Sequence, residues 1–225
     1  YSLNNSQPAA QNQFTNLVPG TYIVDVLGDN GCNASAVVVV EAPDLVEISL
    51  EPTATINLGY SYQIDATVNI PDTEIASVSW TPSTGLDCDT CLNTEATPFN
   101  TTQYQVLVVS DAGCEARGNL QLIVDKTRKI YAPNIFSPNE NGNNDVFTIF
   151  ADPFTVVKIK SLQVYSRWGE QVFEQKDFTA GDIATGWDGT FKGQKLNPGV
   201  FVWQAVVEFV DGKEELFTGD VTLQR

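Results

Sequence analysis

Apolar and polar residues alternate with a period of two along much of the chain, for example in residues 22–26, 62–70 and 104–108. Successive side chains of a strand point to opposite faces, so this pattern predicts half-buried β-strands. Clusters of Gly, Asn, Asp and Pro separate the runs at short intervals, as turns do. No stretch carries a helical apolar stripe over three turns. The sequence therefore predicts an all-β protein made of tandem immunoglobulin-like β-sandwich modules.

One strand-turn-strand pattern occurs twice, at an offset of 82 residues. The repeated positions are Tyr22, Val24, Val26, Asp29, Gly31, Cys32 and Ala34, which recur as Tyr104, Val106, Val108, Asp111, Gly113, Cys114 and Ala116. Repetition at the length of a domain indicates tandem modules, and chance similarity between two hairpins is the alternative. In the first copy, Asn30-Gly31 predicts a type I′ hairpin turn, in which both central residues have positive φ.

Two short segments, residues 41–44 and 125–129, divide the chain into predicted modules of residues 1–42, 43–126 and 127–225. A segment of 42 residues is short for an independent domain. We interpret it as the C-terminal part of a β repeat whose front lies upstream of Tyr1. In the last module the predicted strands are Ile130–Pro133, Val146–Phe150, Val156–Ser166, Gln171–Glu174, Val200–Val210 and Glu214–Leu223.

Acidic residues outnumber basic ones, with 28 Asp and Glu against 12 Lys and Arg and a net charge of -16. The first base is Arg117, so residues 1–116 carry 14 acids and no base. Nucleic acids and anionic membrane surfaces attract basic patches, which argues against both as partners. No apolar run approaches 18 residues, so we do not expect the chain to span a membrane as a helix.

The chain contains no His, which excludes Ser-His-Asp and Cys-His catalysis and His-ligated zinc or haem. A glycosidase needs two carboxylates that face each other across a cleft, and nothing among the acids singles out one pair. We therefore expect no enzymatic activity and no cofactor. The alternative function is a carbohydrate-binding β-sandwich of a secreted protein, with Trp80, Trp168 or Trp187 as the stacking platform.

Cys88 and Cys91 form a single Cys-x-x-Cys motif in a loop after Trp80. One pair without His cannot complete a four-ligand zinc site, and no helix is expected here that would support a redox motif. We expect a short-loop disulfide between these two residues in an exported protein. The sequence leaves the partners of Cys32 and Cys114 open.

Oxygen-bearing side chains gather around Gly142 and resemble a calcium loop. The candidate ligands are Asn139, Asn141, Asn143 and Asp145. Only Glu140 and Asp145 are charged, and no Glu follows at the distance that bidentate ligation needs. We favour a turn held by Asn side chains and expect no metal.

The last module contains several short motifs in a defined order. Residues 131–147 are YAPNIFSPNENGNNDVF, residues 164–170 are VYSRWGE, residues 186–190 are GWDGT, residues 198–201 are PGVF and residues 219–225 are GDVTLQR. Together they resemble the gliding-motility-associated C-terminal domain, the type B sorting domain of proteins exported by the type IX secretion system of Bacteroidota. The resemblance covers about the last 96 residues.

The upstream modules resemble companions of that domain. Residues 18–22 with 29–32 are similar to short repeats of large gliding adhesins, and residues 80–91 are similar to PKD/Ig-like stalk domains. The resemblance implies a secreted, adhesin-like cell-surface protein whose last domain is the signal for type IX secretion and surface retention. It implies PorP/SprF-like outer-membrane barrel proteins and type IX translocon components as partners.

For partner recognition we single out two turns and the terminal strand. These residues are Arg167, Trp168 and Gly169, then Trp187, Asp188 and Gly189, and finally Val221, Leu223 and Arg225. The structural alternatives are a hairpin turn for the first set and a loop anchor for the second. Trp203 lies in an alternating strand, and we expect it in the core.

Overall fold

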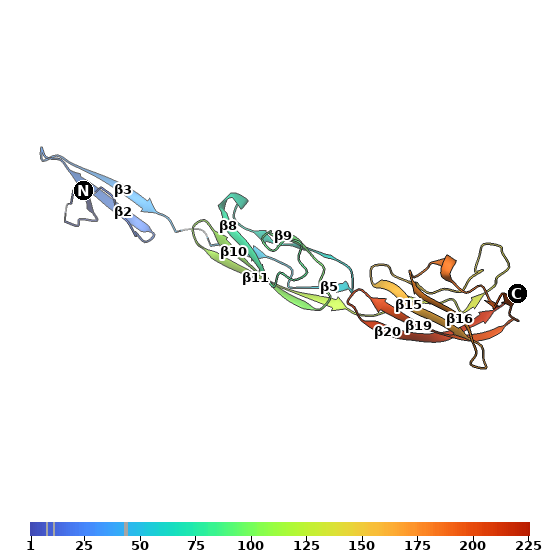
Figure 1. Cartoon of the computed structure of the whole chain (residues 1–225). Helices are drawn as coiled ribbons and strands as arrows, with labels where there is room; N and C mark the ends of the chain where they lie inside the picture. Colours follow the sequence, from blue (N-terminus) through green and yellow to red (C-terminus); the bar gives the residue numbers. More distant parts are fainter. Residues whose placement is uncertain (8, 11, 43–44) are drawn as a thin grey trace.

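The computed structural model describes residues 1–7, 9–10, 12–42 and 45–225 (Figure 1). Within these ranges the regular structure consists of strands and two short 3-10 helices. The chain is an all-β protein of tandem immunoglobulin-like β-sandwich modules, as predicted. The N- and C-termini lie at opposite ends of the molecule (Figure 1). Pro43 and Asp44 of the first predicted boundary lie outside the described residues.

The first segment is a long hairpin with one short additional strand. It contains β1 (Ser2–Leu3), β2 (Gly20–Leu27) and β3 (Asn33–Val40), in the sheet order β1-β2-β3. The apolar residues of this hairpin stay largely accessible: Val26 is 37% exposed and Val38 is 46% exposed.

The middle module is a sandwich with its own core. Its elements are β4 (Ile48–Ser49), β5 (Thr53–Asn57), β6 (Tyr62–Asp65), β7 (Thr67–Val68), η1 (Asp72–Glu74), β8 (Ile75–Thr81), β9 (Asn93–Ala96), β10 (Thr102–Ser110) and β11 (Glu115–Asp125). A four-stranded sheet, β5-β11-β10-β8, is covered by the two-stranded sheets β6-β9 and β4-β7. Tyr104, Val106 and Leu120 lie at its centre and are fully buried because alternate residues of β10 and β11 face the other layer.

The C-terminal module is built on a five-stranded sheet. Its elements are β12 (Ile130–Tyr131), β13 (Ile135–Phe136), β14 (Phe150–Ala151), β15 (Val156–Tyr165), β16 (Gln171–Phe178), η2 (Ile183–Thr185), β17 (Thr190–Phe191), β18 (Gln194–Lys195), β19 (Gly199–Phe209) and β20 (Glu214–Leu223). The sheet order is β13-β20-β19-β15-β16, and the pairs β12-β14 and β17-β18 lie outside it. Trp203 is 6% exposed and belongs to the core, as predicted.

The strand predicted at Val146–Phe150 is wrong. Phe147 makes only an isolated bridge to Trp187, and the next strand is the two-residue β14. Phe147, Thr148 and Ile149 are all fully buried. Three buried residues in succession do not fit a strand with one core face and one solvent face, so the segment passes through the core without regular pairing.

Four hairpins contain the same type of turn. In each turn, a glycine with positive φ donates its N–H to the backbone carbonyl of the residue three positions earlier. That earlier residue in turn donates its own N–H to the backbone carbonyl of the residue that follows the glycine. The turns span residues 28–32, 110–114, 166–170 and 209–213. This is a three-residue loop with a type I turn and a glycine bulge. The type I′ turn predicted at Asn30-Gly31 is wrong, since only Gly31 has positive φ (81°).

The middle and C-terminal modules are in direct contact. Val210, at the β19–β20 turn, packs against the core of the middle module. The rings of Tyr60 and Phe154 lie 5.1 Å apart between their centroids, and the Tyr60 hydroxyl donates a 2.7 Å hydrogen bond to Asp152. This bond raises the pKa of Tyr60 above its ordinary value of 10.0. Apolar contact and hydrogen bonding together fix the two modules in one arrangement.

The segment between these modules, residues 126–129, is held by ion pairs. Arg128 is nearly buried and contacts Asp211 and Glu215, and its guanidinium lies 5.1 Å from the centroid of the Phe209 ring. Lys126 bonds to Asn100 of the middle module and also lies 3.8 Å from Asp211. The linker is therefore a structured part of the joint.

Candidate functional site

The two ends of the C-terminal module differ in what they contact. The β19–β20 turn, with Val210 and Asp211, lies against the middle module. The strand register places the β15–β16 turn at the other end, because Tyr165 pairs with Val202 while Gly199 pairs with Leu223. We call this second end, where the chain also terminates, the distal end (Figure 1).

The β15–β16 turn presents an aromatic side chain to solvent. Trp168 is 82% exposed, and the Arg167 guanidinium lies 4.7 Å from the centroid of its ring. The Ser166 hydroxyl accepts hydrogen bonds from the backbone N–H groups of Trp168 and Glu170, both at 3.3 Å. The turn is thus held locally while its two largest side chains remain free. Tryptophan and arginine are the residue types most enriched at the energetic centres of protein interfaces.

The second predicted turn has a different role. Trp187 is fully buried, and its indole N–H donates to the Thr190 carbonyl at 2.9 Å. Asp188 accepts bonds from the backbone N–H and hydroxyl of Thr190. Gly189 has φ of 75°, and a Cβ there would lie 2.8 Å from Leu223. Trp187 and Gly189 are buried in the folded domain and Asp188 is exposed, so Asp188 alone of this predicted recognition set lies on the surface.

The terminal strand is also mainly structural. Val221 and Leu223, which were predicted for partner recognition, are fully buried and belong to the core of the module. Near its end β20 is paired on both sides, with β19 and with β13, so it offers no free edge there. Arg225 follows the strand, and its guanidinium donates to the carbonyls of Leu196 and Gly189, each at 3.0 Å.

The loop of residues 139–145 is organised by one carboxylate. Asp145 accepts backbone N–H bonds of 2.7–2.8 Å from Asn139, Glu140 and Gly142. Burial raises the pKa of Asp145, but these backbone donors outweigh that effect and hold the pKa below its ordinary value. The side-chain oxygens of Asn139 and Asn141 likewise accept backbone N–H groups. The side-chain oxygens of three of the four residues predicted as calcium ligands, Asn139, Asn141 and Asp145, are therefore engaged within the loop, as in a turn held by Asn side chains.

A small hollow at the distal end was not foreseen from the sequence. It has a volume of about 250 Å³, and its lining includes Pro138, Asp145, Asp188, Lys195 and Arg225. Its walls come from three segments that are far apart in sequence, which explains why no local pattern revealed it. Among residues 1–7, 9–10, 12–42 and 45–225, no cluster of three His, Cys, Asp or Glu side chains is arranged to hold a metal ion. The distal end thus combines the polar side chains of this hollow with the exposed ring of Trp168.

In the middle module, Cys88 and Cys91 form a disulfide, and their Cα atoms lie 5.6 Å apart. Trp80 is buried, and its indole N–H donates to the Cys91 carbonyl at 2.7 Å. Neither Trp80 nor Trp187 can serve as the predicted sugar-stacking platform, because both rings are enclosed. Cys32 is exposed, Cys114 is half-buried, and both are free thiols.

Residues 130–223 match the family model described as the CHU_C Type IX secretion signal domain. The C-terminal module is a type IX secretion signal domain. It interacts with the type IX secretion machinery, and the protein that carries it is secreted across the outer membrane to the cell surface. No helix in the described ranges has both the length and the apolar character required to cross a bilayer. No match to the chain was found among curated proteins.

Several solved structures are similar in fold. The eight N-terminal Ig domains of Down Syndrome Cell Adhesion Molecule are 15% identical, and the match covers 92% of this chain and 30% of that chain at a TM-score of 0.33. Dimeric latent PorU from Porphyromonas gingivalis is 13% identical, and the match covers 91% of this chain and 24% of the PorU chain at a TM-score of 0.29. A bacterial ice-binding adhesin is 13% identical, and the match covers 91% of this chain and 74% of the adhesin chain at a TM-score of 0.33. TM-scores this low carry no information on activity or partners.

Proposed function

We propose that the chain is the C-terminal region of a large adhesin-like surface protein that acts in gliding motility. In this proposal the signal domain is recognised by a PorP/SprF-like outer-membrane barrel protein and by type IX translocon components, which retain it at the surface. The upstream modules serve as a stalk, and residues 1–42 are the C-terminal part of an adhesin-type β repeat. The chain has no enzymatic activity and needs no cofactor.

The exposed Arg167-Trp168 pair is the observation that supports recognition at the distal end. A tryptophan that is 82% exposed is uncommon on a folded module, since large aromatic rings are usually mostly buried. The pair also lies at the end of the signal domain opposite the middle module, where nothing in the described chain blocks access. Arg167, Trp168, Asp188 and Arg225 form the recognition surface of the proposal, which we call the distal surface.

The role of the domain can be tested with a secreted reporter fused in front of residues 127–225. These residues contain their own hydrophobic core, since its buried members all come from residues 136–223. We expect the reporter on the surface of cells with a type IX system and inside cells whose translocon is deleted. Surface delivery of a reporter that lacks residues 127–225 would contradict the proposal.

The role of the distal surface requires a matched pair of variants. Trp168→Ala should lower the amount of reporter retained on the surface about tenfold or more, as for the central residue of an interface. Ile183→Ala removes another apolar side chain that is 67% exposed on the same module, and it should change retention little. Equal retention of both variants would exclude Trp168 as a contact while leaving the secretion role intact.

A further inference from the structure

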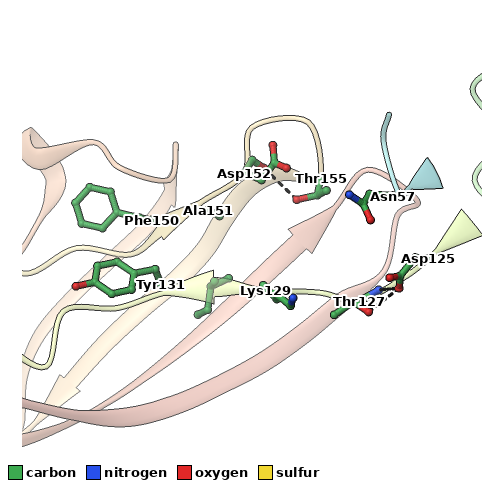
Figure 2. A pocket seen from close by; sticks show the side chains of 10 residues that line it. Asn57, Asp125, Thr127, Lys129, Tyr131, Phe150, Ala151, Asp152 and Thr155 are labelled. Atoms are coloured by element: carbon green, nitrogen blue, oxygen red, sulfur yellow. Dashed lines mark hydrogen bonds between the residues drawn. The ribbon is translucent and has the colours of Figure 1, made fainter. Parts of the chain in front are cut away.

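The joint between the middle and C-terminal modules contains a pocket of about 430 Å³ (Figure 2). This volume lies within the range of small-molecule sites, about 300–1,000 Å³, and such sites are frequent at domain interfaces. The lining is contributed by the end of β5, the end of β11, the linker, β12 and the segment around β14. The pocket therefore exists only because the two modules are joined in this arrangement.

One end of the pocket is aromatic. Tyr131 and Phe150 are cross-strand neighbours in the β12–β14 pair, with ring centroids 6.1 Å apart. Tyr131 is 65% exposed and Phe150 is 38% exposed, so both rings present accessible surface. Figure 2 shows these rings at one end of the pocket and Asn57 and Asp125 at the other. A ligand in this pocket must offer an apolar face at one end and polar groups at the other.

The charges in the pocket disfavour an ionic ligand. Lys129 is exposed there and opposes a metal cation, while Asp125 and Asp152 oppose an anion. The two oxygens of Asp152 already accept bonds from Tyr60 and from the backbone N–H of Phe154. Asp125 uses only Oδ1 to bind Thr127, which leaves Oδ2 as an acceptor for a ligand hydroxyl. The exposed Asn57 amide adds one further donor and acceptor.

The pocket is also held in shape before any ligand arrives. The Tyr60–Asp152 hydrogen bond, the Tyr60–Phe154 ring contact and the packing of Val210 fix one wall against the other. A Cβ on Gly59 would lie 1.9 Å from the Phe154 carbonyl oxygen, so the two backbones approach closely at this point. A pre-formed site loses less conformational entropy on binding than one that must be assembled.

The pocket has an aromatic end, a polar end with free hydrogen-bonding groups, and charges of both signs. From these features we propose that it binds a neutral carbohydrate. One sugar ring stacks its C–H face on the more exposed Tyr131, while Phe150, whose ring is tilted by 47° from that of Tyr131, contacts its side. The sugar hydroxyls bond to Asn57 and to Oδ2 of Asp125. The site uses the rings of Tyr131 and Phe150, and its lining contains none of Trp80, Trp168 and Trp187. It does not depend on the secretion role, because it lies at the joint, away from the distal surface.

The test uses the whole chain and isothermal titration calorimetry with neutral hexasaccharides of glucose, xylose, mannose or N-acetylglucosamine, and with oligogalacturonate as the anionic comparison. At least one of them should bind with a stoichiometry of one per chain. Tyr131→Ala should weaken that binding about tenfold or more, which corresponds to about 1.4 kcal/mol. Asn57→Ala should also weaken it, through lost hydrogen bonds. Both side chains are exposed, so both variants should keep the wild-type melting temperature.

Trp168→Ala is the matched control, since it removes an exposed aromatic ring far from the joint, and it should bind as the wild type does. Three results would overturn the proposal. They are the absence of binding by every neutral hexasaccharide, binding of oligogalacturonate alone, and binding that is lost in Trp168→Ala but kept in Tyr131→Ala. None of them would affect the expected export of the reporter fused to residues 127–225.

Discussion

The β2–β3 and β10–β11 hairpins are built on the same plan and differ in what covers them. Their strands correspond at an offset of 82 residues, and their turns have the same two hydrogen bonds. Val108 and Leu120 are fully buried under the second layer of the middle module. Val26 and Val38, at the corresponding positions, are 37% and 46% exposed.

The difference separates what is local in this fold from what is not. The turn and the strand register form alike in both hairpins, because they depend on residues close in sequence. Within the described residues, burial stabilises mainly the β10–β11 hairpin, because β2–β3 has only the two-residue β1 beside it and no covering layer, and so small a sheet is marginal in water. Native-state hydrogen exchange on the intact chain can measure each hairpin separately.

The largest expected difference concerns the tyrosine shared by the two hairpins. Tyr104 is fully buried, and its hydroxyl donates to the Thr84 carbonyl at 2.8 Å. Tyr104→Ala should lower the free energy of unfolding of the middle module by about 3–5 kcal/mol, through the cavity and the lost contacts. Tyr22→Ala removes a half-exposed ring and should cost about 0.5 kcal/mol. Similar losses of amide protection in the two variants would show that burial does not separate the hairpins.

Much of this architecture was predictable because its signals are local. The alternation of apolar residues located β10, β15, β19 and β20 closely. The turn type was not predictable from Asn30-Gly31, because that dipeptide also fits a three-residue loop in which only the glycine has positive φ. The type I′ turn and the three-residue loop give the strands different registers. The pairing of side chains along the whole hairpin therefore selects the turn.

The second comparison uses one position that differs between the copies. Gly118 faces the covering layer, and a Cβ there would lie 3.1 Å from both Ile48 and Val106. Gly118→Ala should therefore overpack the core and cost about 1–3 kcal/mol. The first hairpin already has Ala36 at this place, and Ala36→Gly should cost only about 0.5–1 kcal/mol by raising backbone freedom. A Gly118→Ala variant more stable than the wild type would mean that the β10–β11 hairpin and its covering layer can move apart without losing stability.

The distal surface was harder to predict than the fold. Trp168 and Trp187 are each followed closely by a glycine in a polar loop, yet one is exposed and the other is fully buried. Trp187 is buried because Phe147, far away in sequence, pairs with it and Phe201 packs on its ring. The joint was missed for the same reason, since Arg128 meets an acid 83 residues later in the chain.

The turn glycines provide a test in which the two hairpins should behave alike. Gly31 and Gly113 both have φ of 81°, and a Cβ would meet nothing within 4 Å at either position. Gly31→Ala and Gly113→Ala should each cost about 1 kcal/mol, since the left-handed backbone strains an L-residue wherever it occurs. Exchange of the amides beside each turn measures this cost. An effect confined to Gly113→Ala would show that the covering layer also acts on the turn.

The smallest expected effect is a pH dependence in the layer that covers β10–β11. The Thr94 hydroxyl and the Glu95 N–H of β9 both donate to Asp87 Oδ1, and together they hold the pKa of Asp87 below its ordinary value of 3.8. A carboxyl group whose pKa is lowered by folding stabilises the fold above its ordinary pKa. This contribution is lost as the pH falls from about 4 through the lower folded value.

Acidification should therefore loosen β9 and reduce the amide protection of β10–β11 toward that of the bare hairpin. The bonds from Thr127 also lower the pKa of Asp125, so Asp125 adds its own contribution to the dependence of stability on pH. The measurement therefore compares how steeply the amide protection of β10–β11 falls with pH in the wild type and in Asp87→Asn. Asparagine keeps an acceptor oxygen but cannot titrate. We expect a shallower loss of protection below about pH 4 in Asp87→Asn. Equal slopes in the two proteins would mean that Asp87 does not couple the covering layer to the hairpin, and that the contrast between the two hairpins is one of apolar burial alone.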